Sequence, residues 1–235
     1  MTDETPIWER PEPAERDTPS PLSRDRIVRA AIALADAEDL DAVSLRKVAG
    51  ALDAGPMRLY RYIGTKEELL ELMVDAVYAE IPGPAGDGWR PLLRSYAHGI
   101  RDAALRHGWF ADLLGGRPHF GPATLAHTEA TLAALHAEPG FGDVDTVMSA
   151  VDVLAVHLIG ALRKEIGERR AERATGLSKW QWQRERGPYL MRALATGRYP
   201  TLERMVREAA HPDAAASFEL GLDYVLDGIE ARLGA

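Results

Sequence analysis

The most informative part of this chain of 235 residues is Val43-Ser-Leu-Arg-Lys-Val-Ala-Gly-Ala-Leu-Asp-Ala-Gly-Pro-Met-Arg-Leu-Tyr-Arg-Tyr-Ile-Gly-Thr-Lys66. Its hydrophobic residues recur at helical spacing in two short runs, and the residues between the runs are those that turns favour. The side chains outside the hydrophobic positions are mostly cationic or aromatic. The stretch therefore predicts two short helices joined by a tight turn, with a basic outer surface.

The first helix of this pair begins after Ser44, whose hydroxyl suits the N-cap position. A single buried stripe at positions i, i+3, i+4 and i+7 is predicted for it, made of Leu45, Val48, Ala49 and Leu52. Arg46 and Lys47 lie outside that stripe. They are expected to face solvent or a partner.

The second helix of the pair follows a break at Asp53-Ala-Gly55 and is predicted to run to about Ile63. Pro56 suits the first turn of this helix, where the missing N–H is not needed. Leu59 and Ile63, four residues apart, are expected to face inward. The residues that then face outward are Arg58, Arg61 and Tyr62.

The flanking segments complete a small helical unit. Residues 1–21 combine five prolines with six acids and are predicted to be a disordered arm. Ser23 is the expected N-cap of a first helix, in which Ile27, Ala30, Ala31 and Leu34 recur at helical spacing. Thr65-Lys-Glu-Glu68 predicts a capping box for a fourth helix that reaches about Ile81. Because that helix is apolar on more than one side, we expect it to pack between two bodies.

The rest of the chain predicts only helices. The stretch Pro82-Gly-Pro-Ala-Gly-Asp-Gly88 is the best boundary between two domains. Helical patterns follow at residues 91–106, 109–114, 122–136, 144–173, 178–196, 201–209 and 213–233. We therefore predict an all-α protein with a helix-turn-helix domain at residues 22–81 and a larger helical domain at residues 82–235.

Composition restricts the class of protein. The chain is 46% hydrophobic and 27% charged, has no cysteine, and contains no run close to ~18 consecutive apolar residues. The start lacks a secretory signal, and the absence of cysteine suits a reducing cytosol, so a cytoplasmic protein without a membrane partner is expected.

Charge is distributed unevenly along the chain, whose net charge is −8. Residues 1–22 carry six acids and two arginines, which gives −4, whereas residues 42–66 carry five cations and one acid, which gives +4. A basic segment in an acidic chain suggests one local anionic partner, although solvated helix faces also produce such excesses.

The chemistry of the pair of helices fits double-stranded DNA. A helix-turn-helix unit places its second helix in the major groove, while the preceding helix braces it against the backbone. Arg46 and Arg58 can offer forked donors to guanine, whereas Tyr60, Tyr62 and Lys66 suit phosphate oxygens. Other readings stay open, since Tyr60 is also compatible with a core position, Arg61 with a solvated one, and Lys66 with a role only in starting the fourth helix.

The segment from Leu22 to Ile81 resembles the DNA-binding domain of the tetracycline-repressor (TetR) family. The resemblance rests on Ser44, Tyr60, Tyr62 and the sequence Lys66-Glu-Glu-Leu69, with Tyr62 in place of the histidine that the family usually has there. The resemblance implies that DNA is contacted by Ser44, Arg46, Lys47, Pro56, Met57, Arg58, Tyr60, Arg61, Tyr62 and Lys66.

The second domain resembles the ligand-binding and dimerisation domain of the tetracycline repressors, through Arg117-Pro118 and the closing run Phe218-Glu-Leu-Gly-Leu-Asp-Tyr-Val-Leu-Asp-Gly-Ile-Glu230. It implies a homodimer whose interface includes Phe218, Leu222, Val225, Leu226 and Ile229, although an intramolecular core would show the same spacing. The residues expected to line an effector pocket are Arg117, Pro118, Phe120, His157 and Trp182.

The histidines and amides that bind tetracycline and magnesium in the tetracycline repressor have no match here, so tetracycline is not the predicted ligand, and neither a metal nor a cofactor is predicted. Motifs for nucleotide binding, hydrolysis or zinc catalysis are also absent. We therefore predict a ligand-responsive repressor, not an enzyme, that is released from a palindromic operator by an unknown small organic effector. Two alternatives remain, a helical protein that binds or modifies a small molecule without DNA binding, and an adaptor that binds only protein.

Overall fold

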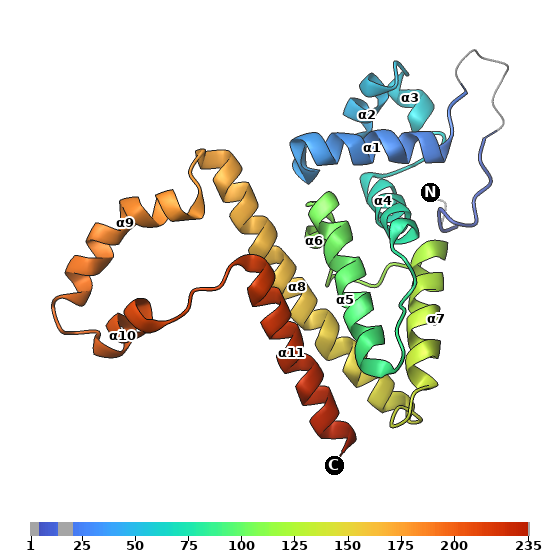
Figure 1. The fold of residues 1–235 in the computed structure, drawn as a ribbon. Helices are drawn as coiled ribbons and strands as arrows, with labels where there is room; N and C mark the ends of the chain where they lie inside the picture. Colours follow the sequence, from blue (N-terminus) through green and yellow to red (C-terminus); the bar gives the residue numbers. More distant parts are fainter. Residues whose placement is uncertain (1–4, 14–20, 235) are drawn as a thin grey trace.

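The computed structural model describes residues 5–13 and 21–234, and in these residues every regular element is helical (Figure 1). The elements are α1 (Arg24–Glu38), η1 (Leu40–Ala42), α2 (Leu45–Ala51), α3 (Pro56–Leu59), α4 (Lys66–Glu80), α5 (Trp89–Arg106), α6 (Phe110–Leu113), α7 (Pro122–His136), α8 (Val144–Thr175), α9 (Lys179–Leu194), α10 (Pro200–Glu208) and α11 (Ala214–Leu233). The all-α prediction is confirmed.

The helix-turn-helix unit is formed by α1, α2 and α3, which pack together at one end of the molecule (Figure 1). The predicted caps are present, since the hydroxyl of Ser23 accepts a hydrogen bond from the Arg26 amide and that of Ser44 accepts one from the Lys47 amide. After α2 the chain turns in a Schellman motif, in which the Ala54 amide donates to the Ala49 carbonyl at 2.9 Å. Asp53 occupies the left-handed position of this turn, with φ 50°.

Helix α3 is shorter than predicted. It ends at Leu59 and not near Ile63, and the next residues continue as a turn in which the Ile63 amide still donates to the Leu59 carbonyl at 3.0 Å. Leu59 and Ile63 are both fully buried, as predicted. The hydrophobic spacing predicted the burial of Leu59 and Ile63 correctly, but it did not predict that the helix would end in a tight turn after Leu59.

Part of the arm before α1 is ordered, which corrects the prediction of disorder for residues 5–13. Ile7 is only 2% exposed, and Arg10 forms an ion pair with Glu68 in the first turn of α4. Arg24 donates a hydrogen bond of 2.6 Å to the Arg10 carbonyl. These anchors offset the entropy of a proline-rich segment. The remainder of the predicted disordered arm lies outside the described residues.

Glu68 is an ionised anchor for this arm. Burial raises the pKa of Glu68, but the hydrogen bonds from Arg10 and from the Gly64 amide, together with the charge of Arg10, outweigh burial and leave the pKa below its usual value. Its carboxylate accepts from the Gly64 amide at 2.7 Å, while the Thr65 hydroxyl accepts from the Glu68 amide at 3.1 Å. The Glu68 carboxylate of the predicted capping box therefore bonds the amide of Gly64, the residue before the N-cap, and not the amide of the N-cap Thr65 itself.

Helix α4 links the two parts of the molecule, as its apolar pattern predicted. It packs against α1 on one side and against α6 and α7 on the other. Its buried residue Asp75 accepts hydrogen bonds from the amide and the hydroxyl of Thr124, at 2.8 and 2.9 Å, in the first turn of α7. A Cβ on Gly121 would lie 2.2 Å from the Asp75 carboxylate, so the residue before α7 has to be glycine. An acid from α4 therefore caps α7.

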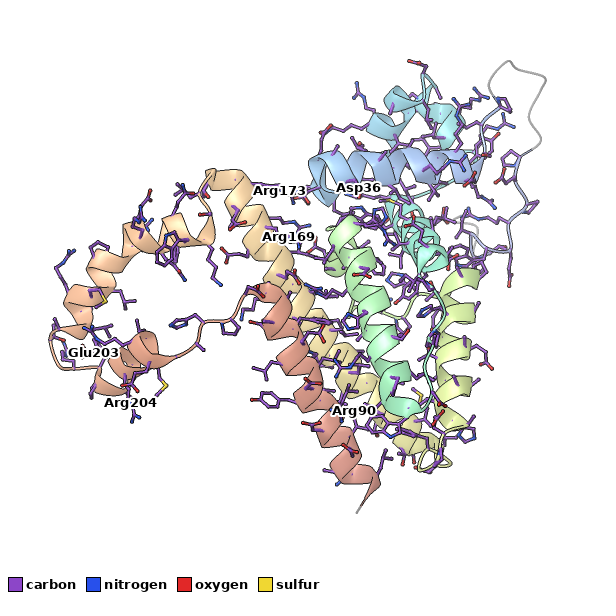
Figure 2. The ribbon with its side chains drawn as sticks, in the orientation of Figure 1. Asp36, Arg90, Arg169, Arg173, Glu203 and Arg204 are labelled. Carbon is purple, nitrogen blue, oxygen red and sulfur yellow. The ribbon has the colours of Figure 1, made fainter. Side chains whose placement is uncertain are left out.

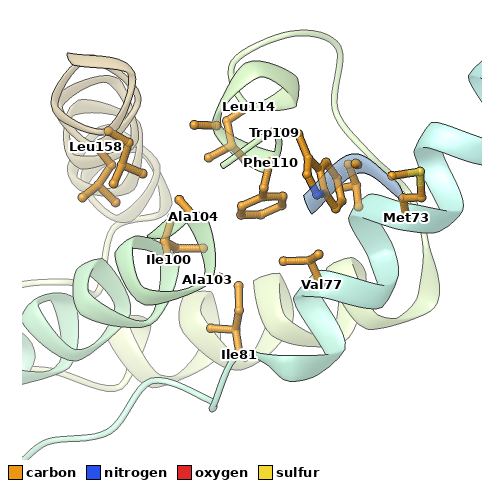
Figure 3. Close-up of a cluster of buried hydrophobic side chains, with 14 of the residues drawn as sticks. Met73, Val77, Ile81, Ile100, Ala103, Ala104, Trp109, Phe110, Leu114 and Leu158 are labelled. Atoms are coloured by element: carbon orange, nitrogen blue, oxygen red, sulfur yellow. The ribbon is translucent and has the colours of Figure 1, made fainter. Parts of the chain in front are cut away.

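The core of the second part lies between α4, α5, α6 and α8 (Figure 3). Trp109 and Phe110, just after α5, are fully buried and meet edge to face with ring centroids 6.4 Å apart. Figure 3 shows Met73 and Val77 of α4 on one side of these rings and Leu158 of α8 on the other. The short helix α6 thereby joins the hydrophobic surfaces of α4 and α8.

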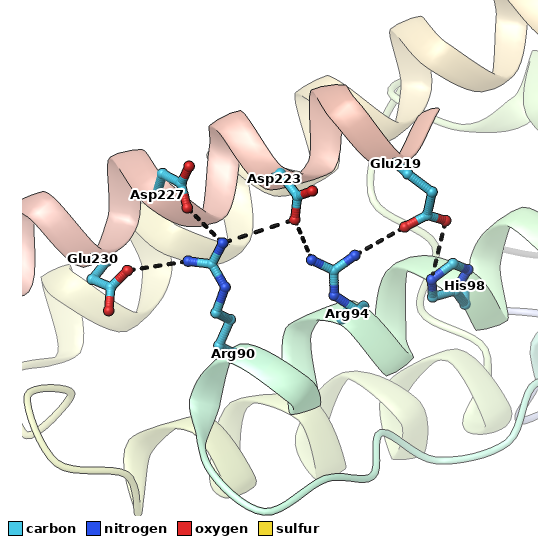
Figure 4. Close-up of polar contacts among 7 residues, drawn as sticks. All are labelled: Arg90, Arg94, His98, Glu219, Asp223, Asp227 and Glu230. Carbon is cyan, nitrogen blue, oxygen red and sulfur yellow. Dashed lines mark hydrogen bonds and ion pairs between the residues drawn. The ribbon is translucent and has the colours of Figure 1, made fainter. Parts of the chain in front are cut away.

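An ionic ladder joins α5 to α11 (Figure 4). Arg94 lies between Glu219 and Asp223, and Arg90 between Asp227 and Glu230, with Nη1 of Arg90 at 3.2 Å from Glu230. Beneath it, Arg101 holds the buried Glu165 of α8 through two hydrogen bonds of 2.9 and 3.1 Å. These contacts fix α11 and α8 to the core by charge as well as by hydrophobic packing.

The long helix α8 leaves much of its apolar surface exposed. It packs against α5, α6, α7 and α11, yet only 22% of its most apolar 18-residue window, with mean hydropathy 1.6, is buried. By length and composition alone α8 would reach across a membrane, a test that core helices of soluble proteins also pass. Val144, Met148 and Val156, spaced by four or eight residues, are 55 to 65% exposed. This stripe needs a partner outside the described chain.

Helices α9 and α10 form an arm that projects from the end of α8, away from the body of the molecule (Figure 1). Leu194 is the buried residue of α9, and α10 has none. The arm exposes several large hydrophobic side chains, namely Trp180, Trp182, Tyr189, Tyr199, Leu202 and Met205. Exposed hydrophobic side chains gathered in this way mark an interaction surface.

Candidate DNA interface and effector site

The outer face of α2, α3 and the first turn of α4 carries positive charge. Arg46, Arg61 and Lys66 are exposed, and none of the three forms an ion pair with the residues that the structure describes. Lys47 is also exposed, with its Nζ 3.2 Å from Glu38 in a surface pair that contributes little. Four of the cations predicted to contact DNA, Arg46, Lys47, Arg61 and Lys66, are therefore accessible in the helix-turn-helix unit and at the start of α4.

The other residues predicted to contact DNA differ in their exposure to solvent. Met57 is 78% exposed and Pro56 is exposed beside it, whereas Arg58 is half-buried at the end of the helix. Ser44 caps α2 with its side chain and keeps its hydroxyl oxygen partly accessible. The tip of α3 thus offers an apolar and a cationic group to a groove.

The two tyrosines of the recognition segment are separated by burial. Tyr60 is 50% exposed, so its hydroxyl is available to a phosphate. Tyr62 is only 3% exposed, which corrects the prediction that it faces a partner. The backbone turn after Leu59 rotates Tyr62 inward, and its carbonyl accepts a hydrogen bond from Arg24 at 3.2 Å. Tyr62 therefore supports the unit from inside.

The residues predicted for an effector pocket do not meet within one chain. Arg117, Pro118 and Phe120 lie in the exposed loop before α7, and Trp182 lies on the projecting arm. His157 packs between α8 and α11, with its ring centroid 6.3 Å from that of Phe218. These five residues therefore do not share one environment within a single chain, and their assignment to an effector pocket stays a prediction.

A different cluster, of one histidine and two tyrosines, lies inside the core, and no specific sequence pattern predicts it. The ring of His127, on α7, lies 5.6 Å from the ring of Tyr78 on α4 and 5.6 Å from that of Tyr96 on α5. Its Nε2 atom is buried and has no hydrogen-bond partner in the part of the chain that the structure describes. Unpaired buried polar atoms are costly, so this nitrogen marks a place that a ligand group can satisfy.

Protonation in this cluster follows from burial. Burial lowers the pKa of His127 more than the hydrogen bond with the Pro82 backbone raises it, so the imidazole is neutral near pH 7. A proline backbone offers only a carbonyl, so the ring nitrogen that bonds it carries the proton and Nε2 is an acceptor. Burial raises the pKa of Tyr78 and of Tyr96, so both phenols also stay neutral. The cluster is aromatic and uncharged, with one free acceptor.

The predicted dimer residues are mostly occupied within the chain. Phe218, Leu222, Leu226 and Ile229 are 0 to 7% exposed and belong to the hydrophobic core, and Val225 is packed against it. The intramolecular alternative therefore holds for these residues. On α11, Leu220 and Tyr224 are exposed instead, at 48 and 69%. The helical spacing identified the buried stripe of α11, but not which side was left for a second chain.

No group of three or more histidine or acidic side chains in the described residues has the geometry of a metal site. Near the cluster of His127, Tyr78 and Tyr96, the acid Asp75 is already engaged by the first turn of α7. The cluster therefore has no charged group with which to bind a cation.

Comparisons with known proteins show what this chain is similar to. The family model described as "Tetracyclin repressor-like, C-terminal domain" matches residues 81–233. The chain is 36% identical, over 95% of its length and 83% of the relative, to the HTH-type transcriptional repressor DrrR1 of Streptomyces coeruleorubidus. It is 29% identical to the tetracycline repressor class A of Escherichia coli transposon 1721, over 90% of this chain and 92% of that one. Streptomyces coelicolor ActR in complex with actinorhodin superposes with a TM-score of 0.75 at 28% identity, covering 92% of this chain and all of that one.

The burial of the two tyrosines predicts different outcomes for two substitutions. Tyr62→Ala should lower the free energy of unfolding by about 3 kcal/mol, because it leaves a cavity in the core. Tyr60→Ala should change that energy by less than about 1 kcal/mol while weakening binding to double-stranded DNA of any sequence. Urea denaturation and fluorescence anisotropy with labelled DNA measure both. Equal destabilisation by the two substitutions would contradict the assigned burial.

Proposed function

The chain belongs to the tetracycline-repressor family of DNA-binding transcriptional regulators, and on that basis we propose that it is a cytoplasmic repressor released from its operator by a small organic effector. The observation that carries the proposal is a set of exposed cations, Arg46 on α2, Arg61 just after α3 and Lys66 at the start of α4, on an otherwise acidic chain. Phosphate contacts supply affinity through such cations, and base contacts supply specificity.

DNA recognition is proposed to begin with α3 in the major groove. Met57 and Arg58 are at the end of this helix, where base edges would be reached, and Arg46 extends from α2 beside it. Lys66 at the start of α4 adds a phosphate contact, favoured by the amides of that helix end. In a symmetric dimer two such units would address half-sites about 34 Å apart, which is one turn of DNA.

Dimerisation is proposed to use the second apolar stripe of α8 and α11. Met148, Val156, Leu220 and Tyr224 are each at least 48% exposed although they lie on core helices. Two copies of a helix pair with such stripes would form a four-helix interface and remove them from water. The projecting arm of α9 and α10 is proposed to lie against the second copy, which would bring Trp182 to the partner.

The effector is proposed to contact His127, Tyr78 and Tyr96. The three rings favour a flat aromatic body, and the free acceptor at Nε2 of His127 favours a hydroxyl on it. Tyr78 lies one turn beyond Asp75 on α4, and Asp75 caps the helix that carries His127. A ligand that separates these rings would therefore move α4, which also packs on α1.

Contacts at the end of α1 provide a second connection between the core and the DNA-reading unit, which is the helix-turn-helix unit of α1, α2 and α3. Asp36 lies 2.9 Å from Nδ1 of His107 and accepts a hydrogen bond of 2.8 Å from Trp109. Asp39 accepts one of 3.2 Å from Arg170 of α8, a residue that also holds Asp112 of α6. The core thus contacts the DNA-reading unit through hydrogen bonds and ion pairs at the carboxyl end of α1.

The contact with Arg170 is made by a residue, Asp39, whose own backbone conformation is unfavourable. Asp39 has φ 65° and ψ 170°, a combination that costs about 1–3 kcal/mol for a residue with a side chain. The side chain of Asp39 is paired with Arg170 of α8 at 3.2 Å, and this contact contributes to holding the conformation. The end of α1 is therefore a place where a small movement of α8 would release strain in the DNA-reading unit.

The DNA proposal is tested by comparing two cations. Arg58→Ala should weaken binding to the native operator by about 1–3 kcal/mol and relax its base preference. Lys66→Ala should weaken binding to all sequences alike and flatten the salt dependence. Anisotropy at several salt concentrations, with the DNA flanking the gene of this protein, separates the two.

Arg29→Ala, which removes an exposed cation of α1, is the matched control and should have little effect. Unchanged affinity and base preference in Arg58→Ala would contradict the groove assignment.

The effector site is tested by His127→Phe, with actinorhodin, the ligand in the ActR complex, as the first probe. Loss of the acceptor should weaken probe binding about tenfold, which is about 1.4 kcal/mol, and leave operator affinity unchanged. Isothermal titration calorimetry and release of labelled operator measure the two quantities. His136→Phe, on the same helix but bonded to the Phe141 carbonyl, is the control. Equal effects of the two substitutions would place the site elsewhere, and chemical conversion of the probe would support the ligand-modifying alternative.

The coupling route is tested by Arg170→Ala, which removes the contact with Asp39. Operator affinity in the absence of effector should stay within about twofold, while the effector-induced loss of affinity should shrink by ~1 kcal/mol or more, since coupling energies are about 1–3 kcal/mol. Arg163→Ala is the control, because Arg163 lies on the same helix but bonds only to the carbonyls of residues 111–114. An unaltered effector response in Arg170→Ala would exclude this route.

A further inference from the structure

A cleft of about 750 Å³ lies where the DNA-reading unit meets the base of the arm. Its walls come from the end of α1, the end of α5, the last turns of α8 and the start of α9. Figure 2 shows Asp36 at the end of α1 facing Arg169 and Arg173 of α8. The effector cluster of His127 is not part of this cleft, whose volume is that of a site for a drug-sized molecule.

The acids that line the cleft already have donors. Asp36 accepts from Trp109, Asp39 from Arg170, and Glu172 from the Lys179 amide at 2.8 Å. These carboxylates therefore have less need of a cation from a ligand.

The cations of the cleft are less fully engaged. Arg106 pairs with Glu80 at 3.4 Å, and Arg169 uses one nitrogen for Glu165 at 3.2 Å while staying 52% exposed. Arg173 is exposed and makes no hydrogen bond or ion pair with the residues that the structure describes. The uncommitted donors of the cleft are therefore guanidinium groups, which suit carboxylate and phosphate oxygens.

The floor of the cleft is apolar. Ala35, Ala104, Leu105, Ile166 and Leu177 line it beneath the charged rim. Ile166 is 3% exposed, whereas Leu105 and Leu177 are partly accessible. A ligand that only paired with the arginines would leave this surface wet, so the floor favours an apolar body attached to the anionic group.

We propose that this cleft is a second ligand site, which binds a small amphiphile with one anionic group held by Arg173 and Arg169. Such a molecule touches α1 of the DNA-reading unit and α8 of the core at once. Its binding energy therefore depends on how the two parts are placed. By thermodynamic linkage, the factor by which the bound amphiphile changes the affinity for operator DNA equals the factor by which operator DNA changes the affinity for the amphiphile. The inference does not depend on the identity of the effector at His127.

The test uses octanoate as the probe and octanol as its uncharged counterpart, titrated by calorimetry into the full-length protein. Octanoate should bind wild type more tightly than octanol does, and Arg173→Ala should weaken octanoate binding about tenfold without affecting octanol. Arg232→Ala, which removes an exposed cation outside the cleft, is the matched control and should leave both affinities unchanged. Because Arg173 is exposed, circular dichroism of the variant should match that of wild type.

The substitution His127→Phe distinguishes the cleft from the cluster around His127 as the site that binds octanoate. It should not change octanoate affinity, since that ring lies outside the cleft. Absence of octanoate binding to the wild-type protein would overturn the proposal, as would equal affinities for octanoate and octanol or an unchanged affinity in Arg173→Ala. A tenfold loss in His127→Phe would assign octanoate to the effector cluster and likewise overturn it. None of these outcomes bears on whether the protein binds operator DNA.

Discussion

The carboxylate of Asp75, a residue of α4, lies at the first turn of α7 and accepts hydrogen bonds from the Thr124 amide and hydroxyl. A buried acid is tolerated there because the first turn of α7 supplies an amide donor, a hydroxyl donor and a favourable helix dipole. The contact fixes the angle between α4 and α7, and so brings the rings of Tyr78 and His127 together. It also ties to the core the helix on which the DNA-reading unit rests. The rest of the architecture depends on this connection.

Two connections run between core and DNA reader, and they differ in chemistry. Along α4 the contact is hydrophobic, through side chains such as Met73 and Val77. At the end of α1 it is ionic, through Asp39 and Arg170, and holds a strained backbone. Hydrophobic packing transmits displacement because it resists compression, whereas an ion pair at a strained residue can open as a unit. The cleft beside Arg173 adjoins the ionic connection and not the hydrophobic one.

Sequence patterns were most reliable where a local rule decides the outcome. Ser23, Ser44 and Thr65 cap the helices for which they were predicted, and α7 has the predicted bounds. They failed where exposure depends on a neighbour distant in sequence. Tyr62 was expected outside and lies inside, since α3 ends one turn early. The apolar stripe around Phe218 was assigned to a second chain and is instead covered by its own core.

The all-helical class, the helix-turn-helix unit with its basic residues, and the family could be recognised from the order of residues alone, because caps, turns and charge are local properties of the chain. Which polar groups share an environment depends instead on how the helices pack. His127, Tyr78 and Tyr96 come from three helices, and Asp36 and Arg173 are far apart in the chain, so no spacing rule brings them together. Their chemistry arises from burial and proximity, which depend on how helices pack and not on the order of residues along one helix.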